Sequence, residues 1–487
     1  MAQSKENIVL FPFMAQGHIL PFLALAHQLE QRNNYNIIFI NTPLNTKKIK
    51  SSLLPNSSIR LLEIPFDSSK HGLPPNSENT DTLPFSLMVQ LLQTSHSFKP
   101  AFQKLFFNLV QELGHPPLCL IVDLFFSWTA EIAHEFGVFH AIFNAGGGYG
   151  MACYHSLWSN LPSMNTPFDE FSLPGFPRGS LIRTNQIPEN IRVSKITDPW
   201  TVFHHKMFNE WLDSDAFLFN TVEMFDHVGL NYFRRQVNLP VWPIGPVLLS
   251  TKTESRGGRE SGIKWELIKK WLDTKPSSSV LYISFGSQST ILASQMMQLA
   301  LSLDASGKNF IWVVRPPKEF DINSEFRANE WLPNDFKERI RSKNQGLLVH
   351  SWSPQLKILS HKATSAFLSH CGWNSVIESL SNGVPLLAWP IMAEQHFNAK
   401  MLEEEAGVCV QVAEGLCEVK HEEILEKIEL VMNETDKGKD MRRKASEVKE
   451  DINNAIRDEE GLKGSSVKAL DEFLHAAVVS RRVRQGI

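Results

Sequence analysis

Short apolar runs alternate along the chain with longer segments in which apolar residues recur every three or four positions. Residues 7–13 (NIVLFPF) predict a buried strand, residues 18–32 predict a helix with an apolar face, and residues 35–41 (YNIIFIN) predict a second strand. A strand, a helix and a strand in this order are typical of a parallel sheet covered by helices. Ligands of such sheets bind beyond the carboxyl ends of the strands. We therefore expect His18, which follows the first strand, to lie at the ligand-binding edge.

The same alternation continues and then starts again in the second half of the chain. Further strands are predicted at residues 118–122, 138–143, 216–220, 280–284, 310–315, 347–350 and 364–369, and helical regions at residues 83–113, 127–136 and from Ile291 onward. Asp123 stands directly after one of these strands and so shares the carboxyl edge with His18. Two such series predict an α/β protein with two Rossmann-like, doubly wound domains.

A polar segment separates the two series. Residues 250–262 (STKTESRGGRESG) are charged and contain glycine, as is typical of a linker between domains. The residues after the second series are helical in pattern and heavily charged, which predicts a solvated helix face. We expect an N-terminal domain over residues 1–246, a linker over 247–264, a second domain over 265–460 and a helical tail over 461–487.

Composition narrows the class of protein. The chain has 487 residues, of which 43% are hydrophobic and 21% charged, so it is globular and too long for one ordinary core. Its formal net charge of −4 argues against a nucleic-acid partner, which would need a basic face. The apolar run at the start is too short for a signal peptide, and no apolar stretch is long enough to span a bilayer. We expect a cytoplasmic protein without a membrane span.

The five cysteines support the same compartment. They form no CxxC pair and no metal-binding spacing with histidine, which favours reduced thiols in the cytosol. They are Cys119, Cys153, Cys371, Cys409 and Cys417.

The chemistry concentrates between Trp352 and Gln395. A predicted strand leads into His370-Cys371-Gly372-Trp373-Asn374-Ser375, which opens a predicted helix. Backbone N–H groups at a helix start are unpaired and carry partial positive charge, so Gly372, Asn374 and Ser375 would offer donors to a phosphate. His370 could give a diphosphate a hydrogen bond or a positive charge.

Other residues of this stretch suit the rest of a nucleotide sugar. Glu378 lies one helical turn beyond Asn374, and its carboxylate can accept from two neighbouring ribose hydroxyls. Trp352 offers an aromatic face for a base, with Gln355 within a turn of it. A second strand is expected to end in the polar pair Glu394-Gln395.

Two glycine-bearing turns invite comparison with phosphate-binding loops. Phe285-Gly286-Ser287 follows the strand at residues 280–284 and precedes a helix, which suits a diphosphate at Ser287. Residues 145–150 (AGGGYG) fail the G-x-G-x-x-G spacing and lie far from the first strand-to-helix turn. The second turn therefore does not predict a dinucleotide site, which disfavours an NAD-dependent dehydrogenase.

The stretch from Trp352 to Gln395 resembles the signature box of the plant secondary-metabolite UDP-glycosyltransferases. It contains W-S-P-Q, H-C-G-W-N-S, E-x-x-x-x-G-V-P and a closing E-Q, and it departs from the commonest form in having Ser353 for Ala and Glu394 for Asp. The resemblance implies the GT-B fold, in which two Rossmann-like domains face each other across a cleft. It also implies a last helix that crosses back to the first domain.

The resemblance implies roles for individual residues as well. Gly17-His18 and Asp123 stand where the family keeps its base and the partner of that base, with Gly17 bordering the donor. In the box, Trp352 and the backbone of Ser353 would hold uracil, Gln355 and Glu378 the ribose, and His370, Asn374 and Ser375 the diphosphate, while Trp373, Glu394 and Gln395 would face the sugar. Because a closing Gln is associated with glucose in this family, UDP-glucose is the expected donor.

The chemistry that follows is base-assisted displacement. The unperturbed pKa of histidine, near 6.5, suits proton abstraction at neutral pH, and such catalysis contributes ~10²–10⁴-fold. Asp123 would fix the tautomer of His18 and stabilise its imidazolium form. Direct attack on an α-linked donor inverts the anomeric centre and gives a β-glucoside. No Asp-x-Asp motif stands near the box, so we expect no metal and no cofactor other than the co-substrate UDP-glucose.

Structural interpretations compete with these roles. His18 could be a histidine that merely packs near a helix start, and Asp123 could be only a helix N-cap. Trp352 and Trp373 could be core aromatics, and Cys371 is expected to be a small packing residue. The position of His18 in the first strand-helix-strand unit and the completeness of the box favour the chemical interpretation.

Acceptor specificity is expected to come from apolar side chains, most of them in the first domain. They would line a pocket for a flat or polycyclic molecule, although each could equally be core. The candidates are Met14, Phe85, Phe125, Phe126, Tyr149, Phe203, Met207 and Met392.

We therefore expect a monomeric UDP-glucose-dependent O-glucosyltransferase that acts on a small lipophilic plant metabolite, with a flavonoid or other phenolic first and a terpenoid second. A UDP-sugar epimerase or hydrolase on the same fold is an alternative, as is a non-catalytic UDP-sugar-binding protein. An intact His18 and Asp123 speak against the last, because a binding protein has no use for the pair.

Overall fold

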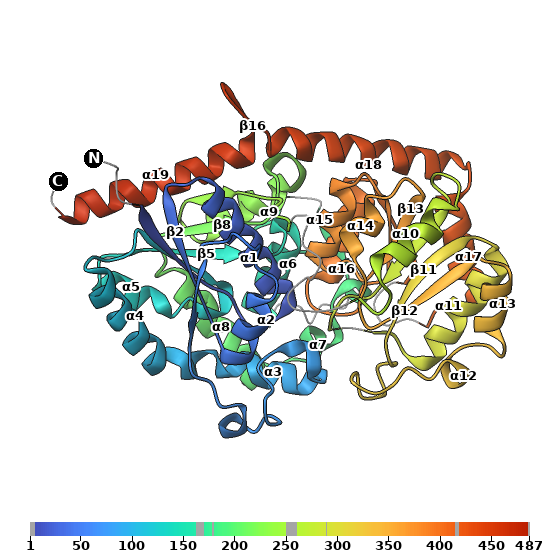
Figure 1. The fold of residues 1–487 in the computed structure, drawn as a ribbon, viewed down its shortest axis with the longest axis horizontal. Helices are drawn as coiled ribbons and strands as arrows, with labels where there is room; N and C mark the ends of the chain where they lie inside the picture. Colours follow the sequence, from blue (N-terminus) through green and yellow to red (C-terminus); the bar gives the residue numbers. More distant parts are fainter. Residues whose placement is uncertain are drawn as a thin grey trace.

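The computed structural model describes residues 5–161, 170–177, 180–249, 261–288, 290–413 and 418–485. Two parallel sheets, each flanked by helices, lie side by side (Figure 1). The first sheet has the spatial order β3 (Arg60–Glu63), β2 (Tyr35–Asn41), β1 (Glu6–Phe11), β4 (Cys119–Asp123), β5 (Phe139–Asn144), β8 (Ala216–Phe219) and β9 (Val241–Pro243). The second has the order β12 (Gly346–His350), β11 (Asn309–Val314), β10 (Val280–Ser284), β13 (Thr364–Ser369), β14 (Leu386–Ala388) and β15 (Cys409–Gln411).

Helices connect the strands of both sheets. Those of the first half are α1 (Gln16–Gln31), α2 (Pro43–Lys50), α3 (Phe85–Gln93), α4 (Lys99–Leu113), α5 (Thr129–Glu135), α6 (Gly148–Ser159), α7 (Glu189–Arg192), α8 (Pro199–Trp211) and α9 (Glu223–Gln236). Those of the second half are α10 (Trp265–Asp273), α11 (Ala293–Ser306), α12 (Ala328–Trp331), α13 (Phe336–Ser342), α14 (Gln355–Leu359), α15 (Trp373–Ser381), α16 (Gln395–Lys400), α17 (His421–Met432), α18 (Asp436–Ala455) and α19 (Ser465–Gln485). Two short hairpins, β6 (Glu170–Ser172) with β7 (Leu181–Arg183) and β16 (Asp458–Glu459) with β17 (Leu462–Lys463), lie outside the sheets.

Continuous apolar runs build the central strands. Every residue of β4, β5, β10 and β13 is buried, as expected for parallel strands covered on both faces. Neighbouring strands are in parallel register, for example Ile8 beside Cys119 and Tyr282 beside Phe367. The predicted two-sheet α/β architecture is confirmed.

The strand order places a crevice at the same point of each sheet. In the first sheet the order reverses between β1 and β4, and in the second between β10 and β13. The loops that leave two such neighbouring strands diverge to opposite sides and open a crevice at the carboxyl ends, where ligands bind. His18 and Asp123 follow β1 and β4, whereas the turn at Gly286 and the box loop at His370 follow β10 and β13.

Two elements differ from the sequence prediction. The helical region at residues 83–113 is divided into α3, a 3₁₀ turn (Thr94–Phe98) and α4, which has a proline in its first turn. The strand expected to end in Glu394-Gln395 ends instead at Ala388, and Gln395 begins α16. Pro390, two residues after the strand, lacks the N–H that a continuing ladder would need.

The glycine run at residues 145–150 enters α6 and does not bind phosphate in the manner of a dinucleotide loop. The buried carboxylate of Asp226 accepts the N–H of Tyr149 at 2.7 Å and also the N–H of Gly148. Burial raises the pKa of Asp226 to about 6, an effect that these two N–H groups oppose. The donors of the helix start are therefore already occupied by a side chain of the same domain.

The predicted linker is described only at its ends. Residues 250–260 lie outside the described residues. Val247 and Leu249 are buried in the core of the first domain, and Gly262 donates its N–H to the carbonyl of Trp352 at 3.0 Å. The chain therefore enters the second domain beside the first residue of the signature box.

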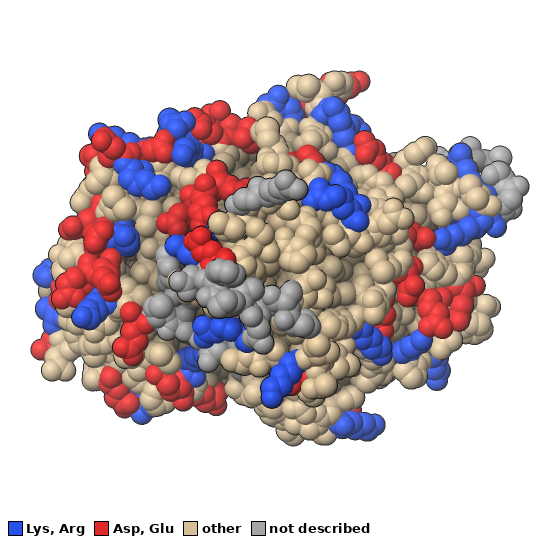
Figure 2. Space-filling view, turned by 180° about the vertical axis from the view of Figure 1, so that it is seen from behind, with Lys and Arg blue, Asp and Glu red and all other residues tan. Residues whose placement is uncertain are grey.

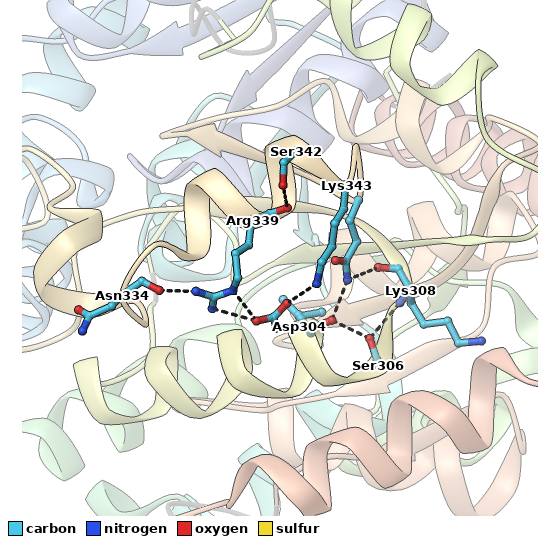
Figure 3. A network of polar contacts seen from close by, with 9 residues as sticks. Asp304, Ser306, Lys308, Asn334, Arg339, Ser342 and Lys343 are labelled. Carbon is cyan, nitrogen blue, oxygen red and sulfur yellow. Dashed lines mark hydrogen bonds and ion pairs between the residues drawn. The ribbon is translucent and has the colours of Figure 1, made fainter.

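A polar network on the second domain fixes α13 against α11 (Figure 3). Arg339 Nε donates to Asp304 at 2.8 Å, and Lys343 contacts the other oxygen of that carboxylate at 3.3 Å. Gln345, which precedes β12, donates to the carbonyls of Leu303 and Lys308 at 3.0 and 3.2 Å. These contacts hold the outer edge of the second sheet, away from its carboxyl ends.

The surface gives no support for a polyanion site on the face seen in Figure 2, where Lys and Arg side chains are interspersed with Asp and Glu among the described residues. Across the described ranges, no helix combines the length and apolar character needed to cross a bilayer.

The last helix, α19, returns to the first domain and lies along it (Figure 1). Its Leu470, Phe473 and Leu474 are buried in the core that contains β1, β2 and β5. Arg481 pairs with both oxygens of Glu6 at 2.7 and 2.5 Å, and this hydrogen bonding lowers the pKa of Glu6 against the effect of burial. The C-terminal helix is thus part of the first domain's core.

We predict that Phe473→Ala destabilises the first domain by about 3–5 kcal/mol, because it removes a fully buried ring from between α19 and the sheet. Urea unfolding followed by circular dichroism measures the loss. The matched control is His475→Ala on the exposed side of α19, which should change the free energy of unfolding by less than about 0.5 kcal/mol. Equal effects of the two substitutions would contradict the packing of α19.

Candidate active site

A cavity of about 340 Å³ lies between the carboxyl ends of the two sheets. Its wall includes His18 and Phe125 from the first domain and Trp352, His370 and Glu378 from the second. The crevice of each sheet therefore opens into one shared space. Loops that follow several strands of both sheets meet in this space, so their side chains can act on the same ligand.

His18 is held by a buried carboxylate. Its Nδ1 lies 2.7 Å from Oδ2 of Asp123, which is fully buried, whereas 26% of the His18 side chain is exposed. A carboxylate can only accept, so Nδ1 of the neutral ring carries the proton and Nε2 has a free lone pair. The second oxygen of Asp123 accepts the N–H of Phe125 at 3.2 Å. Asp123 thus caps the turn after β4 and also orients His18. The interpretation as an N-cap and the interpretation as the partner of His18 therefore both describe its contacts.

The environment of His18 makes it a stronger base than free histidine. Burial lowers its pKa, but the charge and hydrogen bond of Asp123, together with the charge of Glu394, outweigh burial and raise the pKa above 6.5. For Glu394, burial has the opposite sign: it raises the pKa of the carboxyl, an effect that the charge of His18 opposes. A base of raised pKa beside a carboxylate can take a proton at neutral pH and hold the resulting charge.

His370 is enclosed by two glycines. A Cβ on Gly286 would lie 2.6 Å from its Nε2, and a Cβ on Gly372 would lie 2.5 Å from the same atom, so a side chain at either position would displace the ring. Gly286 also has a φ of 80°, which favours glycine. Burial lowers the pKa of His370 to about 4, against a smaller opposing effect of the Ser284 backbone. His370 is therefore neutral, and it offers a hydrogen bond rather than the positive charge that the sequence also allowed.

The loops around His370 are strained. Cys371, Ser351 and Ala393 have φ values of 60°, 66° and 52°, in the left-handed region that non-glycine residues rarely adopt. Such strain clusters at binding sites, where it fixes the backbone for a ligand. Cys371 is fully buried, as expected for a packing residue. Gly372 precedes α15, and within the described ranges no side chain caps the first N–H groups of this helix.

Gln355 and Glu378 form one hydrogen-bonded unit. Gln355 donates from Nε2 to Glu378 at 3.0 Å and to the hydroxyl of Ser375 at 3.2 Å, while the hydroxyl of Tyr282 donates to its carbonyl oxygen at 3.2 Å. These bonds fix the amide of Gln355, so a ligand meets a preorganised carboxylate and amide. Tyr282 also bonds the hydroxyl of Ser353 at 2.8 Å.

The two residues at the start of the box have different environments. Trp352 is half-buried and lines the cavity, so a face of its ring can accept a flat ligand. Ser353 is buried, and its hydroxyl is engaged with Tyr282. The Ser353 carbonyl accepts the N–H of Gln355 at 2.8 Å, and the role of this backbone toward uracil stays a prediction. Ser287 lines the cavity too, and its carbonyl accepts from Arg315.

Gln395 is oriented by its own loop. Its Oε1 accepts the N–H groups of Ile391 and Met392, each at 3.0 Å, so its NH₂ group is the end available to the cavity that it lines. Glu394 stands beside it on the same wall. The pair therefore offers one donor and one carboxylate to hydroxyl groups of a ligand.

Trp373 and Asn374 join the two domains. Asn374 Nδ2 donates to the carbonyl of Gly17 at 2.8 Å, and Trp373 Nε1 donates to the carbonyl of Asn220 at 2.7 Å. A Cβ on Gly147 would lie 2.8 Å from the ring of Trp373, so the backbone there lies directly on the indole, and Phe225 of α9 stacks with the same ring at a centroid distance of 6.1 Å. The resemblance gave these two side chains to the diphosphate and the sugar. Nε1 of Trp373 and one hydrogen of the Asn374 amide are engaged in the domain contact, and both residues border the cavity, so the roles that the resemblance gave them stay predictions.

The predicted acceptor residues divide into two groups. Phe125, Met207 and Met392 line the cavity. Met14, Phe126, Tyr149 and Phe203 are buried in the core and do not line it, which corrects that part of the prediction. The side chain of Phe85 lies outside the described part of the chain. Aromatic character alone did not separate wall from core, because both environments favour large apolar side chains.

Sequence reasoning missed several cavity residues. Tyr282, whose hydroxyl stands in a buried strand and so requires a partner, could have been found by that signal. Gln16 Oε1 and Asn144 Nδ2 are buried on the cavity wall and have no hydrogen-bond partner among the described residues. Tyr154 and His204 also border the cavity. The local sequence around Tyr154 and His204 gave no sign of the cavity, because the tertiary packing of α6 and α8 brings these two residues to its wall.

The described residues also bear on metal binding. Within them, no three His, Cys, Asp or Glu side chains gather closely enough to hold a metal ion. The carboxylates of the box that border the cavity are those of Glu378 and Glu394.

Comparison with known proteins gives a consistent result. A family model described as UDP-glucoronosyl and UDP-glucosyl transferase matches residues 264–452. UDP-glycosyltransferase 92A1 of Arabidopsis thaliana is 48% identical over 493 residues, with 99% of each chain covered. Crocetin glucosyltransferase 3 of Crocus sativus is 41% identical over 448 residues, covering 90% of this chain and 92% of that one. The structure of Phytolacca americana UGT2 complexed with UDP-2fluoro-glucose and pterostilbene has a TM-score of 0.78 at 26% identity, covering 97% of this chain and 100% of that one.

We predict that the pKa of His18 lies above 6.5 and falls when Asp123 is replaced by Asn, because the substitution removes the charge that favours the protonated ring. NMR titration of ring-labelled histidine measures it, with His18→Gln identifying the signal. Glu210→Gln is the control, since Glu210 bonds His96 at 2.8 Å in a similar pair elsewhere. A wild-type pKa at or below 6.5 would contradict this description of the site.

Proposed function

The chain belongs to the plant UDP-glycosyltransferase family and has the GT-B fold, and we propose that it is an inverting, metal-independent O-glucosyltransferase that uses UDP-glucose. As a member of this family it is a glycosyltransferase. The observation that carries the rest is the hydrogen bond of His18 to buried Asp123, at 2.7 Å, on the wall of the cavity that the signature box also lines.

The first domain supplies the base. In our proposal the acceptor hydroxyl binds at Nε2 of His18, which takes its proton as the oxygen attacks the anomeric carbon. Asp123 holds Nδ1–H and stabilises the imidazolium that forms. The oxygen–carbon bond forms as the bond to the UDP oxygen breaks, so the anomeric centre inverts. An α-linked donor then gives a β-glucoside, and the proton remains on His18 until solvent removes it.

The second domain holds the donor. We place uracil against Trp352 and the backbone of Ser353, and the ribose against the Gln355–Glu378 unit, whose amide is already oriented. The diphosphate would lie at the uncapped start of α15 and at neutral His370, with the turn at Ser287 beside it. This arrangement supports transfer without a metal, because hydrogen-bond donors meet the charge that develops on the leaving group.

We propose that the last two residues of the box make the enzyme specific for glucose as the donor sugar. The NH₂ group of Gln395 and the carboxylate of Glu394 would bind hydroxyls of the sugar, and the hydrogen bonds of Gln395 Oε1 to the loop keep that NH₂ group in place. The complex of Phytolacca americana UGT2 with UDP-2fluoro-glucose supports a glucose donor.

The acceptor is proposed to be a small lipophilic plant metabolite, a flavonoid or other phenolic first and a terpenoid second. The part of the cavity beyond His18 is bordered by apolar side chains, among them Met88, Leu92, Phe125, Met207 and Met392. The name of crocetin glucosyltransferase 3 and the complex of UGT2 with pterostilbene support this proposal.

We predict that His18→Ala lowers acceptor-dependent release of UDP from UDP-glucose by at least about 10²-fold, because the base is lost, while UDP binding changes less than twofold. UDP release is measured in EDTA with a mixed pool of phenolics and terpenoids, and UDP binding by calorimetry. His134→Ala is the control, since His134 pairs with Asp215 at 3.0 Å on the outer surface.

Each alternative gives a different result in the same assay. Release of UDP without any acceptor would indicate a hydrolase, and loss of UDP affinity in His18→Ala with transfer intact would overturn the role of the base. Loss of wild-type activity in EDTA that added Mg²⁺ or Mn²⁺ restores would overturn metal independence.

A further inference from the structure

Tyr154 of α6 and His204 of α8 meet on the cavity wall. Their Oη and Nε2 atoms lie 3.0 Å apart, and both residues border the cavity. Tyr154 is partly exposed to this space, whereas His204 is buried to 1% exposure. No step of the proposed transfer uses either residue.

The surroundings of His204 fix its tautomer. Its Nδ1 lies 2.8 Å from the carbonyl oxygen of Trp200, which can only accept, so Nδ1 carries the proton. The ring is stacked on Trp158 with centroids 4.3 Å apart and meets Trp200 edge-on at 4.4 Å. Burial in this aromatic cluster lowers the pKa of His204 to about 3, so the ring is neutral and Nε2 has only a lone pair.

Tyr154 must therefore be the donor in the pair. Its single hydrogen is directed to Nε2 of His204, and its oxygen remains an acceptor. Burial raises the pKa of Tyr154, and the side chain of Trp158 acts on the same hydroxyl in the opposite direction. Nε1 of Trp158 makes no hydrogen bond to the described residues, so it does not occupy the accepting side of the Tyr154 oxygen. The Tyr154 oxygen can thus accept a hydrogen bond from the cavity but has no hydrogen to give.

Aromatic rings separate this pair from the base. Phe125 lies 5.7 Å from His18 between ring centroids, Phe203 lies 6.2 Å from Phe125, Trp200 lies 5.3 Å from Phe203, and His204 lies 4.4 Å from Trp200. A ligand that reaches both His18 and Tyr154 must have an apolar part that covers the interval. Met88, Val89, Leu92, Met151 and Met207 border the same part of the cavity.

We propose that the Tyr154–His204 pair is a specificity site that accepts a hydrogen bond from a second hydroxyl of the acceptor, separate from the one that is glucosylated. This inference rests on the proposed function for its substrate. It deepens that function, because it selects aromatic acceptors with two or more hydroxyls over their O-methylated forms. A methoxy group has no hydrogen to donate, so it would leave the Tyr154 oxygen unpaired in an apolar wall.

Three flavonols test the selection, since they differ at one ring position only. Kaempferol has a hydroxyl there, kaempferide a methoxy group and galangin a hydrogen. Equilibrium binding to the full-length protein saturated with UDP is measured by calorimetry, so that no transfer is needed. We expect kaempferol to bind about tenfold more tightly than kaempferide and about fivefold more tightly than galangin.

Variants assign the preference to the pair. Tyr154→Phe should weaken kaempferol about tenfold and leave galangin within twofold, so that the preference disappears. Tyr232→Phe is the matched control, because Tyr232 also bonds a histidine, His155, at 2.8 Å but does not border the cavity. It should leave all three affinities within twofold. His204→Phe frees the hydrogen of Tyr154, so kaempferide should then bind as well as kaempferol or better.

The outcomes separate this proposal from the proposed function. Equal binding of the three flavonols, binding of none, or an unchanged preference in Tyr154→Phe would overturn the specificity site. Selective binding without any glucoside from UDP-glucose would overturn the transferase proposal and leave the site in place. A measurement independent of acceptor is the ¹⁵N spectrum of ring-labelled histidine, with His204→Phe for assignment. We expect an unprotonated Nε2, and a protonated Nε2 would overturn the proposal.

Discussion

The contact between the box loop and the first domain is the constraint on which the site depends. Asn374 holds the carbonyl of Gly17, the residue next to the base, and Trp373 holds the carbonyl of Asn220 while its ring lies on the bare backbone of Gly147. Each sheet makes a crevice at its own strand-order reversal. A crevice in one domain could bind a donor or an acceptor alone. The two hydrogen bonds and the indole contact set the crevices opposite each other, so His18 faces the donor box across one cavity.

Burial acts differently on the two cavity histidines. No carboxylate among the described residues pairs with His370, and burial lowers its pKa to about 4, so it is a neutral hydrogen-bonding group beside Gly286 and Gly372. His18 has Asp123 at 2.7 Å and the charge of Glu394, and its pKa rises. In the proposed transfer, one fold would thus supply a base in one domain and an uncharged anion-binding group in the other. The proposed Tyr154–His204 site depends on burial in the same way. A neutral histidine of fixed tautomer takes the hydrogen of the Tyr154 hydroxyl, so that hydroxyl can only accept a hydrogen bond from the bound substrate.

Much of the fold was readable from the sequence, because buried parallel strands are continuous apolar runs and the polar residues after them mark the carboxyl edges. His18 and Asp123 were found in this way, and the resemblance located the donor box. The end of β14 at Ala388 was missed, since a short strand and the loop after it look alike in hydropathy until Pro390 is weighed. The acceptor wall was only partly found. Whether Tyr149 or Tyr154 faces the cavity is decided by how α6 rotates against α8 and α9, which no local pattern encodes.

The pH dependence of kcat/KM for glucosyl transfer tests the central claim most directly. If His18 is the base and Asp123 raises its pKa, activity is lost as pH falls through a pKa above 6.5, because the protonated ring cannot accept a proton. In Asp123→Asn the acid limb should move to lower pH and the plateau should fall. A wild-type rate that does not change between pH 5 and 9, or a limb that Asp123→Asn leaves in place, would contradict the account.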